Sequence, residues 1–410
     1  MRLLRQNRSF RMLFSATAVS NLGDGVSALA FPWLATLITR DASLIALVAF
    51  ATSLPWLLVS IPVGVLVDRY DRRLLMVQAD TFRLLLTCGV IALIFSAQSL
   101  PPEGQELRYI LALSGLALLL GTAEVVRDNA AQTVLPALVA KPDLEEANGQ
   151  LWSIEQVMGA FVGPPLAGLL IAWAVPAPFA LDAVTFGIAA FLVYCIALPK
   201  RPPAPARRIW PQIVEGWRFM AGHAALLRLA LMLGLINAFS TMTFTILILY
   251  SQDVLGLNAV GHGVMMTAGA AGGVIGGILG PHIARRLGPQ RSVLTALAMM
   301  VIPFGILFAT SNPWVAGFAL FLEMTIALLW NIVTVSYRQR LIPDALLGRV
   351  NALYRFFGWG MMPFGALIGG WLVSLGEPSL GRELAIRVPF AVGAIGSMTL
   401  FAYGLWRLRL

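Results

Sequence analysis

Cysteine and histidine are scarce in this 410-residue chain, which has two cysteines and three histidines. Cys88 and Cys195 each stand inside an apolar run and show no regular spacing, so we expect two reduced, buried thiols rather than a disulfide framework. The histidines, His223, His262 and His282, are dispersed and lack the spacing of a metal site. No metal is therefore expected.

Charge is scarce as well. Only 12% of the residues are charged and 58% are hydrophobic, with a mean hydropathy of +0.80. Soluble proteins are about a quarter charged, and their surfaces need that polar content. The net charge of +9 is spread in short basic groups between apolar runs, whereas a nucleic-acid binder gathers its basic residues on one patch. The composition predicts a membrane protein and no nucleic-acid partner.

Signatures of catalysis and of ATP use are also missing. The sequence has no Walker-type phosphate loop and no Gly-x-Ser-x-Gly element. We therefore expect no enzyme, no cofactor and no ATP-driven pump.

What the chain has in quantity is long apolar runs. A membrane-spanning helix needs about 20 largely apolar residues. The first run follows a basic start and has no small-residue cleavage site, so it is interpreted as a retained span and not as a signal peptide. We predict an all-α membrane protein with twelve transmembrane helices near 12–38, 44–67, 74–98, 108–134, 150–173, 177–198, 226–251, 261–284, 290–310, 314–337, 350–375 and 386–406.

Arginine placement predicts the orientation. If both ends of the chain are cytoplasmic, nearly all basic loop residues fall on the inner side, as the positive-inside rule requires. The outer loops then hold only Arg40, Arg108, Arg382 and Arg387. We expect a multi-pass protein of the bacterial inner membrane, monomeric, with the lipid bilayer as its solvent.

Two similar halves flank one long connection. Residues 199–225 begin with a proline-rich basic stretch, and Ile213–Phe219 has the pattern of a short amphipathic helix on the inner surface. Three short matches recur in order on either side of it, about half a chain apart, beginning at Pro136 and Pro343. We predict halves 1–198 and 226–410 as parallel six-helix repeats, an organisation that many secondary transporters share.

The most specific motif follows the second run and reads Gly64-Val-Leu-Val-Asp68-Arg69-Tyr-Asp71-Arg72-Arg73. It resembles motif A of the major facilitator superfamily. Asp71 stands where the pattern has its second glycine, and Asp can also take a left-handed turn conformation. A copy at 280–288 lacks the acid. The resemblance implies a gate in which Asp68 meets the start of span eleven, with Arg349 and Asn351 as its partners.

Within that superfamily the chain is similar to bacterial drug:proton antiporters of the macrolide-efflux type. The similarity lies in Ser20–Gly25, Phe31–Trp33, Leu181–Phe186, Asp253–Gly256 and Leu341–Gly360. It implies proton-coupled efflux of amphipathic or hydrophobic small molecules by alternating access. Gly163–Gly168 is similar to the antiporter motif C, and is interpreted as either a hinge or ordinary close packing.

Ionisable residues inside the runs are the candidate coupling groups, because a charge near the bilayer centre costs at least roughly 2.5–3.5 kcal/mol. Asp24, a lone acid on a polar stripe, lies thirteen residues past Arg11, about 20 Å along the helix. It is either a proton-coupling site or a structural hydrogen-bonding group. Glu323 is a second buried candidate of either kind, and Asp182 is interpreted as structural.

Span four carries three charged residues at i, i+3 and i+4, namely Glu124, Arg127 and Asp128. We expect Arg127 to pair with Glu124, Asp128 or Glu155. The group is either a structural ion-pair cluster or part of a proton path, with Glu124 the proton-coupling candidate. Candidate cavity residues for an apolar cargo are Asn21, Phe31, Trp33, Phe239, Phe244, Asn331, Tyr354 and Trp359.

Three functions remain open at this point. The favoured one is proton-coupled efflux of drugs or macrolide-like compounds. The second is export of an endogenous metabolite such as a siderophore or a lysolipid, or uptake of a nutrient. The least favoured is a membrane receptor or enzyme that transports nothing.

The orientation is directly testable. We expect a cysteine placed at Arg207 to react only with reagents that enter the cytoplasm, because the basic connection 199–225 should lie inside. Labelling of Arg207→Cys by a membrane-impermeant maleimide in intact cells would contradict the predicted topology, and an Arg108→Cys variant, expected outside, is the matched control.

Overall fold

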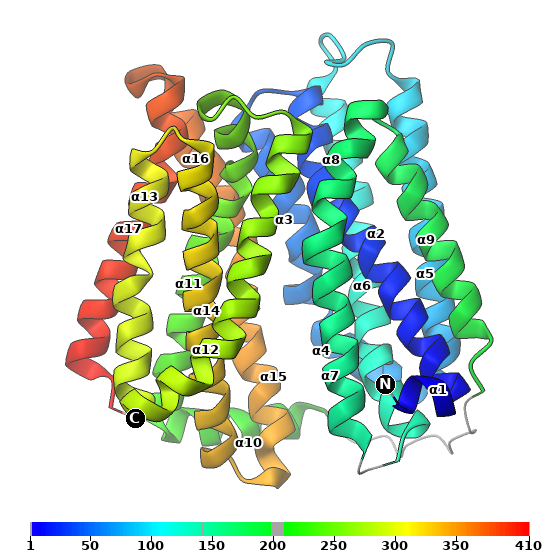
Figure 1. Cartoon of the computed structure of the whole chain (residues 1–410), viewed down its shortest axis with the longest axis vertical. Coiled ribbons are helices and arrows are strands. Elements are labelled where there is room, and N and C mark those ends of the chain that lie inside the picture. The colour runs from blue at the N-terminus through cyan, green and yellow to red at the C-terminus, as the bar shows by residue number, and fades with distance from the viewer. Residues whose placement is uncertain (1, 141–142, 198–208, 410) are drawn as a thin grey trace. The chain divides into compact units, whose positions relative to one another are not determined.

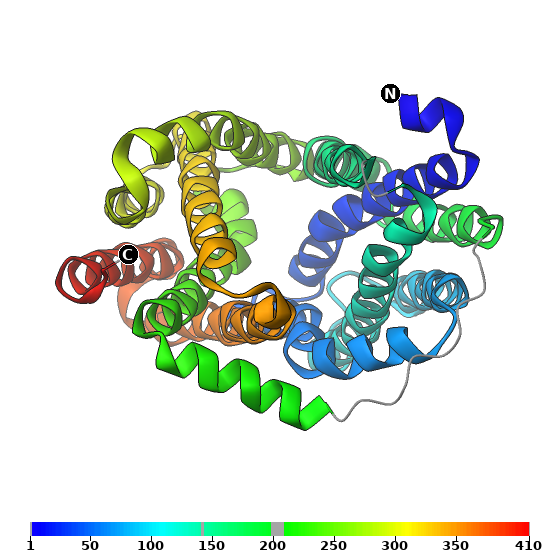
Figure 2. The same cartoon turned by 90° about the horizontal axis from the view of Figure 1, so that it is seen from below.

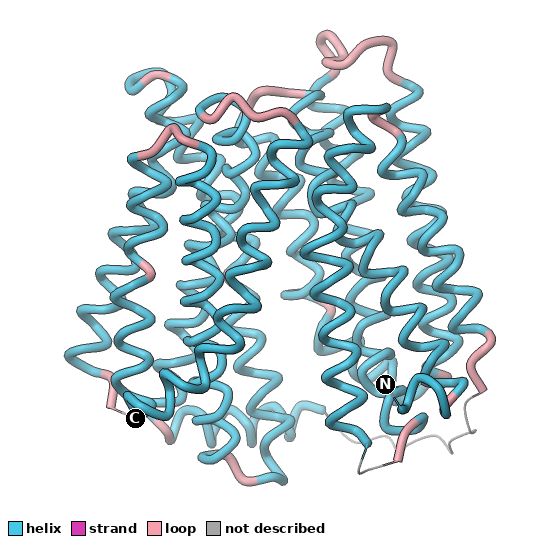
Figure 3. The backbone as a smooth tube through the Cα atoms, in the orientation of Figure 1, coloured by secondary structure: helices cyan, strands magenta, loops and turns pink. Residues whose placement is uncertain are grey.

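The structure is a computed structural model that describes residues 2–140, 143–197 and 209–409. It is built of helices joined by short loops, and no strand occurs in these ranges (Figure 1, Figure 3). The predicted all-α class is confirmed. Of the predicted connection 199–225, residues 199–208 lie outside the described part.

The chain forms two compact units that nearly follow the two halves of the sequence. Unit 1 contains the described residues of 1–40, 51–206 and 259–264, and unit 2 contains those of 41–50, 207–258 and 265–410. Two short segments thus belong to the unit formed by the opposite half: residues 41–50 count with unit 2, and residues 259–264 with unit 1.

In unit 1, α2 packs against α5's neighbours α6 and α9 and against α8, while α5 lies between α6 and α9. Apolar cores form on either side of the middle of α2. The helices are α1 (Arg2–Gln6), α2 (Arg8–Ile38), α3 (Ala42–Leu58), α4 (Ser60–Arg69), α5 (Arg72–Ser96), α6 (Glu106–Leu138), α7 (Leu144–Glu155), a π-helix (Gln156–Val162), α8 (Gly163–Trp173) and α9 (Ala177–Tyr194).

In unit 2, α11 packs against α15, α16 and α17, around a core of its own. Helix α10 runs across α15 and α11 instead of along them (Figure 2). The helices are α10 (Ile209–Gly222), α11 (Ala224–Leu249), a π-helix (Tyr250–Val254), α12 (Ala259–Met299), α13 (Val301–Ala309), α14 (Pro313–Leu341), α15 (Asp344–Gly360), α16 (Met362–Leu380) and α17 (Arg382–Arg407).

Nine helical stretches in the described residues are long and apolar enough to cross a membrane. One of them, Ala259–Ala309, covers two of the twelve predicted spans, because the chain turns at Gly288 (φ 73°, ψ 170°) with almost no loop. The first two predicted spans correspond to α2 and to the pair α3 and α4, which are not among the nine. The multi-pass architecture is therefore shown, and the count of twelve stays a prediction.

The motif A loop caps a helix and makes no left-handed turn. Asp71 is extended (φ −63°, ψ 115°), and its carboxylate accepts the backbone N–H groups of Arg73 and Leu74 at 2.9 and 3.2 Å as the N-cap of α5. The expected left-handed conformation was wrong, since the chain meets a helix start here. The side chains of Gly64, Asp68 and Arg69 lie outside what the structure describes.

The two arginines that follow fasten α5 to its neighbours in unit 1. Arg72 Nη1 donates to the Thr133 carbonyl at 2.9 Å, at the end of α6, and Arg73 Nη1 donates to the Ile196 carbonyl at 3.2 Å, beyond α9. Helix carbonyls at C-termini lack intrahelical partners, and a guanidinium satisfies them well.

Both cysteines are free and exposed. The expectation of buried thiols was wrong, because apolar runs in a membrane protein have a lipid-facing side on which a small apolar residue is also stable.

A seam of small residues joins α2 to α8. Gly163, Pro164 and Pro165 begin α8, and the prolines offer no N–H to the preceding turn, which widens into the π-helix Gln156–Val162. A Cβ on Gly163 would come within 3.0 Å of the backbone of Gly25 and Val26, and a Cβ on Gly25 would meet the backbone of Gly159. We call Gly25, Gly159 and Gly163 the glycine seam.

The seam predicts a sharp difference between two glycines. Gly163→Ala should lower the stability of the protein by about 1–3 kcal/mol, because overpacking against backbone cannot be relieved by a rotamer change. Gly115→Ala in α6, where an added Cβ meets nothing within 4 Å, should be neutral or slightly stabilising. Thermal unfolding in detergent measures both, and equal melting temperatures would contradict the tight seam.

Candidate functional site

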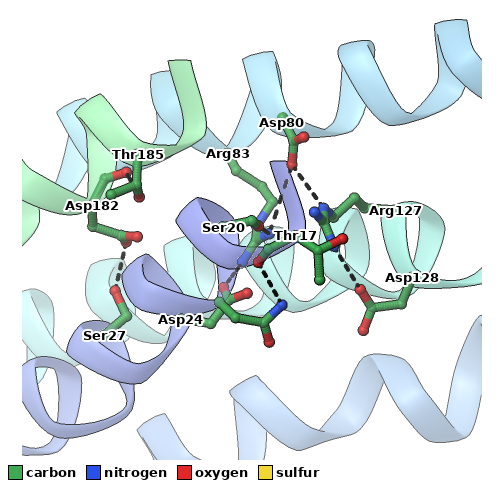
Figure 4. Close-up of polar contacts among 11 residues, drawn as sticks. Thr17, Ser20, Asp24, Ser27, Asp80, Arg83, Arg127, Asp128, Asp182 and Thr185 are labelled. Atoms are coloured by element: carbon green, nitrogen blue, oxygen red, sulfur yellow. Dashed lines mark hydrogen bonds and ion pairs between the residues drawn. The ribbon is translucent and has the colours of Figure 1, made fainter. Parts of the chain in front are cut away.

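Helix α2 carries a polar stripe between two apolar clusters. Thr17 and Ser20 are buried and Asp24 is half-buried, at steps of three and four residues along one helix face. Phe10 and Leu13 belong to the apolar cluster before the stripe. Val26, Leu29 and Ala167 form the cluster after it. The stripe therefore lies in the middle of an otherwise apolar helix (Figure 4).

Asp24 is paired with an arginine from the neighbouring helix. Arg83 of α5 donates from Nη2 to Asp24 Oδ1, and its Nη1 lies 3.4 Å from the Ser20 hydroxyl (Figure 4). The guanidinium carbon stands 3.9 Å from the centre of the Phe186 ring, a cation–π arrangement. The expectation that Asp24 is a lone acid was wrong, because its partner comes from another span.

A fully buried carboxylate links this pair to a second one. Asp80 has no exposed side-chain surface, and its Oδ1 lies 3.3 Å from Arg127 Nε of α6 and 3.9 Å from Arg83 Nη1. Asp80 thus stands between two guanidiniums, one on its own helix and one on the next (Figure 4).

Arg127 continues to a third carboxylate. Its Nη1 is 3.4 Å from Asp128 Oδ1. Of the three partners predicted for Arg127, the structure gives Asp128, and Asp80 joins it from outside the predicted set. We call the alternating series Asp24, Arg83, Asp80, Arg127 and Asp128 the ion chain.

The two ends of the ion chain are accessible and its middle is not. The side chains of Asp24 and Asp128 are 29% and 37% exposed, whereas Asp80 and both arginines are buried. A proton or a cargo group that reaches this site therefore meets carboxylates first.

A hydroxyl holds a further acid beside the chain. Ser27 donates to Asp182 Oδ2 at 2.6 Å, and Thr185 donates to the Asp182 carbonyl at 2.7 Å. The absence of a side chain at Gly23 makes room for this contact, because a Cβ there would overlap both Asp182 and Thr185. The hydrogen-bonded, buried place of Asp182 agrees with its structural interpretation.

Carboxyls outnumber guanidiniums in this region. Glu124 and Glu155 are half-buried and lie within electrostatic reach of the ion chain. With Asp182, the group then holds six acids against Arg83 and Arg127 among the described residues. Because uncompensated charge is costly in a membrane interior, the group is suited to taking up positive charge.

Asp80 and Arg83 were missed by the sequence analysis. They stand at i and i+3 within the apolar run 74–98, eight and eleven residues past Arg72, or about 12 and 17 Å into the helix. The rule that singled out Asp24, an ionisable residue deep in a span, also applies to them.

Unit 2 holds one other predicted coupling residue. Glu323 of α14 is buried, and its Oε1 accepts a hydrogen bond from Ser240 of α11 at 3.1 Å. Its contact is thus a neutral hydroxyl, in contrast to the arginines beside Asp24 and Asp128.

The predicted cavity residues divide by exposure. Phe31 packs edge-on against Phe179, with ring centres 5.4 Å apart, and Tyr354 donates to the Leu229 carbonyl at 3.3 Å. These two are buried in the packing of their units. The half-buried members are Asn21, Trp33, Phe239 and Trp359, and the exposed ones are Phe244 and Asn331.

The predicted gate residue Arg349 has a partner in its own unit. It forms an ion pair with Glu215 of α10, and a Cβ on Gly216 would touch Arg349 as well. Trp217 packs against Phe357 with ring centres 6.0 Å apart. Asn351 is half-buried. Helix α10 is thereby tied to α15, the helix that carries both predicted gate partners.

Comparison with known proteins gives a family. A family model described as transmembrane secretion effector, of the major facilitator superfamily, matches residues 4–394. The enterobactin exporter EntS of Shigella boydii serotype 4 is 27% identical over 86% of this chain and 82% of its own. The EntS of Salmonella choleraesuis is 25% identical over 98% and 94%.

Solved structures show the same fold. The nucleoside transporter NupG superposes with a TM-score of 0.77 at 11% identity, covering 97% of this chain and all of its own. A bacterial homologue of the iron transporter ferroportin gives 0.74 at 18% identity, covering 96% and 99%. At these identities the likeness concerns the fold alone.

The buried middle of the ion chain should matter for folding. Arg127→Leu leaves Asp80 without its nearer cation, and breaking a buried pair in this way costs about 3–5 kcal/mol. Asp80→Asn combined with Arg127→Gln removes both charges and should recover most of that loss. Arg108→Leu, at the exposed start of the same helix, is the control. Thermal unfolding in detergent that ranks the double variant below Arg127→Leu would contradict the pairing.

Proposed function

This chain belongs to the transmembrane secretion effector family of the major facilitator superfamily, and from that premise we propose that it exports a siderophore-class small molecule in exchange for protons. The cargo class rests on the curated relatives, which are named as enterobactin exporters. Their likeness extends over most of both chains, so it concerns the whole transport unit. Efflux of drugs or macrolide-like compounds, the function favoured by the motifs, is compatible with the family but has less support.

The observation that carries proton coupling is the ion chain with its two accessible carboxylates. Asp24 and Asp128 are within reach of solvent and are each held by an arginine behind them. A carboxylate in this position can exchange a proton with the aqueous cavity of a transporter, and its arginine limits the cost of the ionised state. Glu124 and Glu323 remain further candidates for the coupled proton.

The finer architecture belongs to the same proposal. It comprises twelve spans in two parallel six-helix repeats, both termini on the cytoplasmic side of a bacterial inner membrane, and a monomeric transporter. Motif A supplies a gate in which Asp68 acts with Arg349. Because Glu215 already pairs with Arg349, the gate arginine is positioned by α10.

Transport by the purified full-length protein in liposomes tests the proposal. With an imposed pH gradient we expect concentrative movement of enterobactin, and less or none of the macrolide erythromycin. Asp24→Asn should reduce gradient-driven transport at least about tenfold while passive exchange of cargo persists, because a neutral amide cannot carry the proton.

The matched control is Glu106→Gln, which removes a carboxyl at the outer end of α6 and should leave transport unchanged. Movement of erythromycin but not enterobactin would favour the drug-efflux function. Full gradient dependence in Asp24→Asn would rule out Asp24 as the coupling group.

A further inference from the structure

The ion chain has two ends on different helices. Asp24 comes from α2 and Asp128 from α6, and each is the outer member of an ion pair whose arginine is buried. The two pairs share one inner carboxylate, Asp80 of α5, which lies 3.9 Å from Arg83 and 3.3 Å from Arg127. Three acids alternate with two bases, so the fully ionised chain lacks one positive charge.

We propose that Asp24 and Asp128 are two separate positions for one proton, and that filling either position weakens proton binding at the other. This inference rests on the proposed proton coupling but adds a second site, Asp128, and a rule of single occupancy. The missing positive charge then sits at one end of the ion chain or at the other.

The first reason is direct electrostatic repulsion. Asp24 and Asp128 are close enough for each to act on the charge state of the other. Two ionised carboxylates repel, and each makes a proton on the other more favourable. Neutralising one end removes that help, so the second proton binds less well than the first.

The second reason is the shared carboxylate. When Asp24 is neutral, Arg83 loses its strongest attraction, and the nearest remaining ionised partner is Asp80. Two guanidiniums then compete for Asp80, whose oxygens accept no hydrogen bond from the described residues. Arg127 is left freer to pair with Asp128, which favours the ionised form of that end. The same argument runs in reverse from Asp128 to Asp24.

Other charged groups face the chain and set its background. Glu124 lies on α6 beside Arg127 and Asp128, Glu155 ends α7, and Asp182 on α9 is held by Ser27. These groups are acids, so they raise the total demand for positive charge at both ends. None of them bridges the two arginines as Asp80 does, so the exchange between ends runs through α5.

Infrared titration of the full-length protein in lipid tests the inference without any cargo. The C=O stretch of a protonated carboxyl is followed against pH, and the bands lost in Asp24→Asn and in Asp128→Asn identify the two ends. Asp24→Asn should lower the midpoint pH of the Asp128 band by about one unit, a tenfold change in proton affinity. Because coupling between sites is reciprocal, Asp128→Asn should lower the midpoint of the Asp24 band by the same amount.

Glu106→Gln is the matched control on α6, since it lies 22 residues from Asp128, about 33 Å along the helix. It should move neither band. Asp80→Asn should shrink the mutual shift if it folds, and the two end variants decide the matter if it does not. Independent midpoints, unequal shifts, or the absence of a titrating band at either end between about pH 4 and 10 would overturn the inference. Each readout is separate from transport, so a failure to move enterobactin leaves this test intact.

Discussion

The cost of an unpaired charge in a low-dielectric interior is the constraint on which unit 1 depends. Arg83 and Arg127 are buried in the middle of a helical layer, and each is held by two carboxylates from different helices. Because the partners come from α2, α5 and α6, the ion chain fixes how these helices lie against one another. The glycines at 23, 25 and 163 then serve the same end, since they let backbones approach closely enough for short polar side chains to meet.

The sequence revealed the elements and part of the site. Apolar run length located the helices, and depth along a run identified Asp24 and the Glu124–Asp128 group. Pairing was beyond its reach, because a depth rule says that an ionisable residue needs a partner and not which helix provides it. Asp24 was therefore interpreted as alone, although Arg83 stood at comparable depth in span three. Asp71 failed for a similar reason: the residue suits both a left-handed turn and an N-cap, and only the start of α5 decides between them.

Coupling and cargo are separate questions in this molecule. The ion chain presents carboxylates at its accessible ends and is a means of holding and exchanging positive charge. It carries little information on the shape of a cargo, and the aromatic residues proposed for that purpose include two that are buried in packing. The cargo class therefore comes from relatives whose likeness spans most of the chain, whereas the coupling chemistry comes from contacts within unit 1.

The glycine seam has a consequence for how motion in this protein can be measured. With no side chain between the backbones of α2 and α8 at Gly25, Gly159 and Gly163, neither helix can slide without a clash. A pair of spectroscopic labels across the seam is therefore a ruler of fixed length, against which movements of every other helix pair can be calibrated.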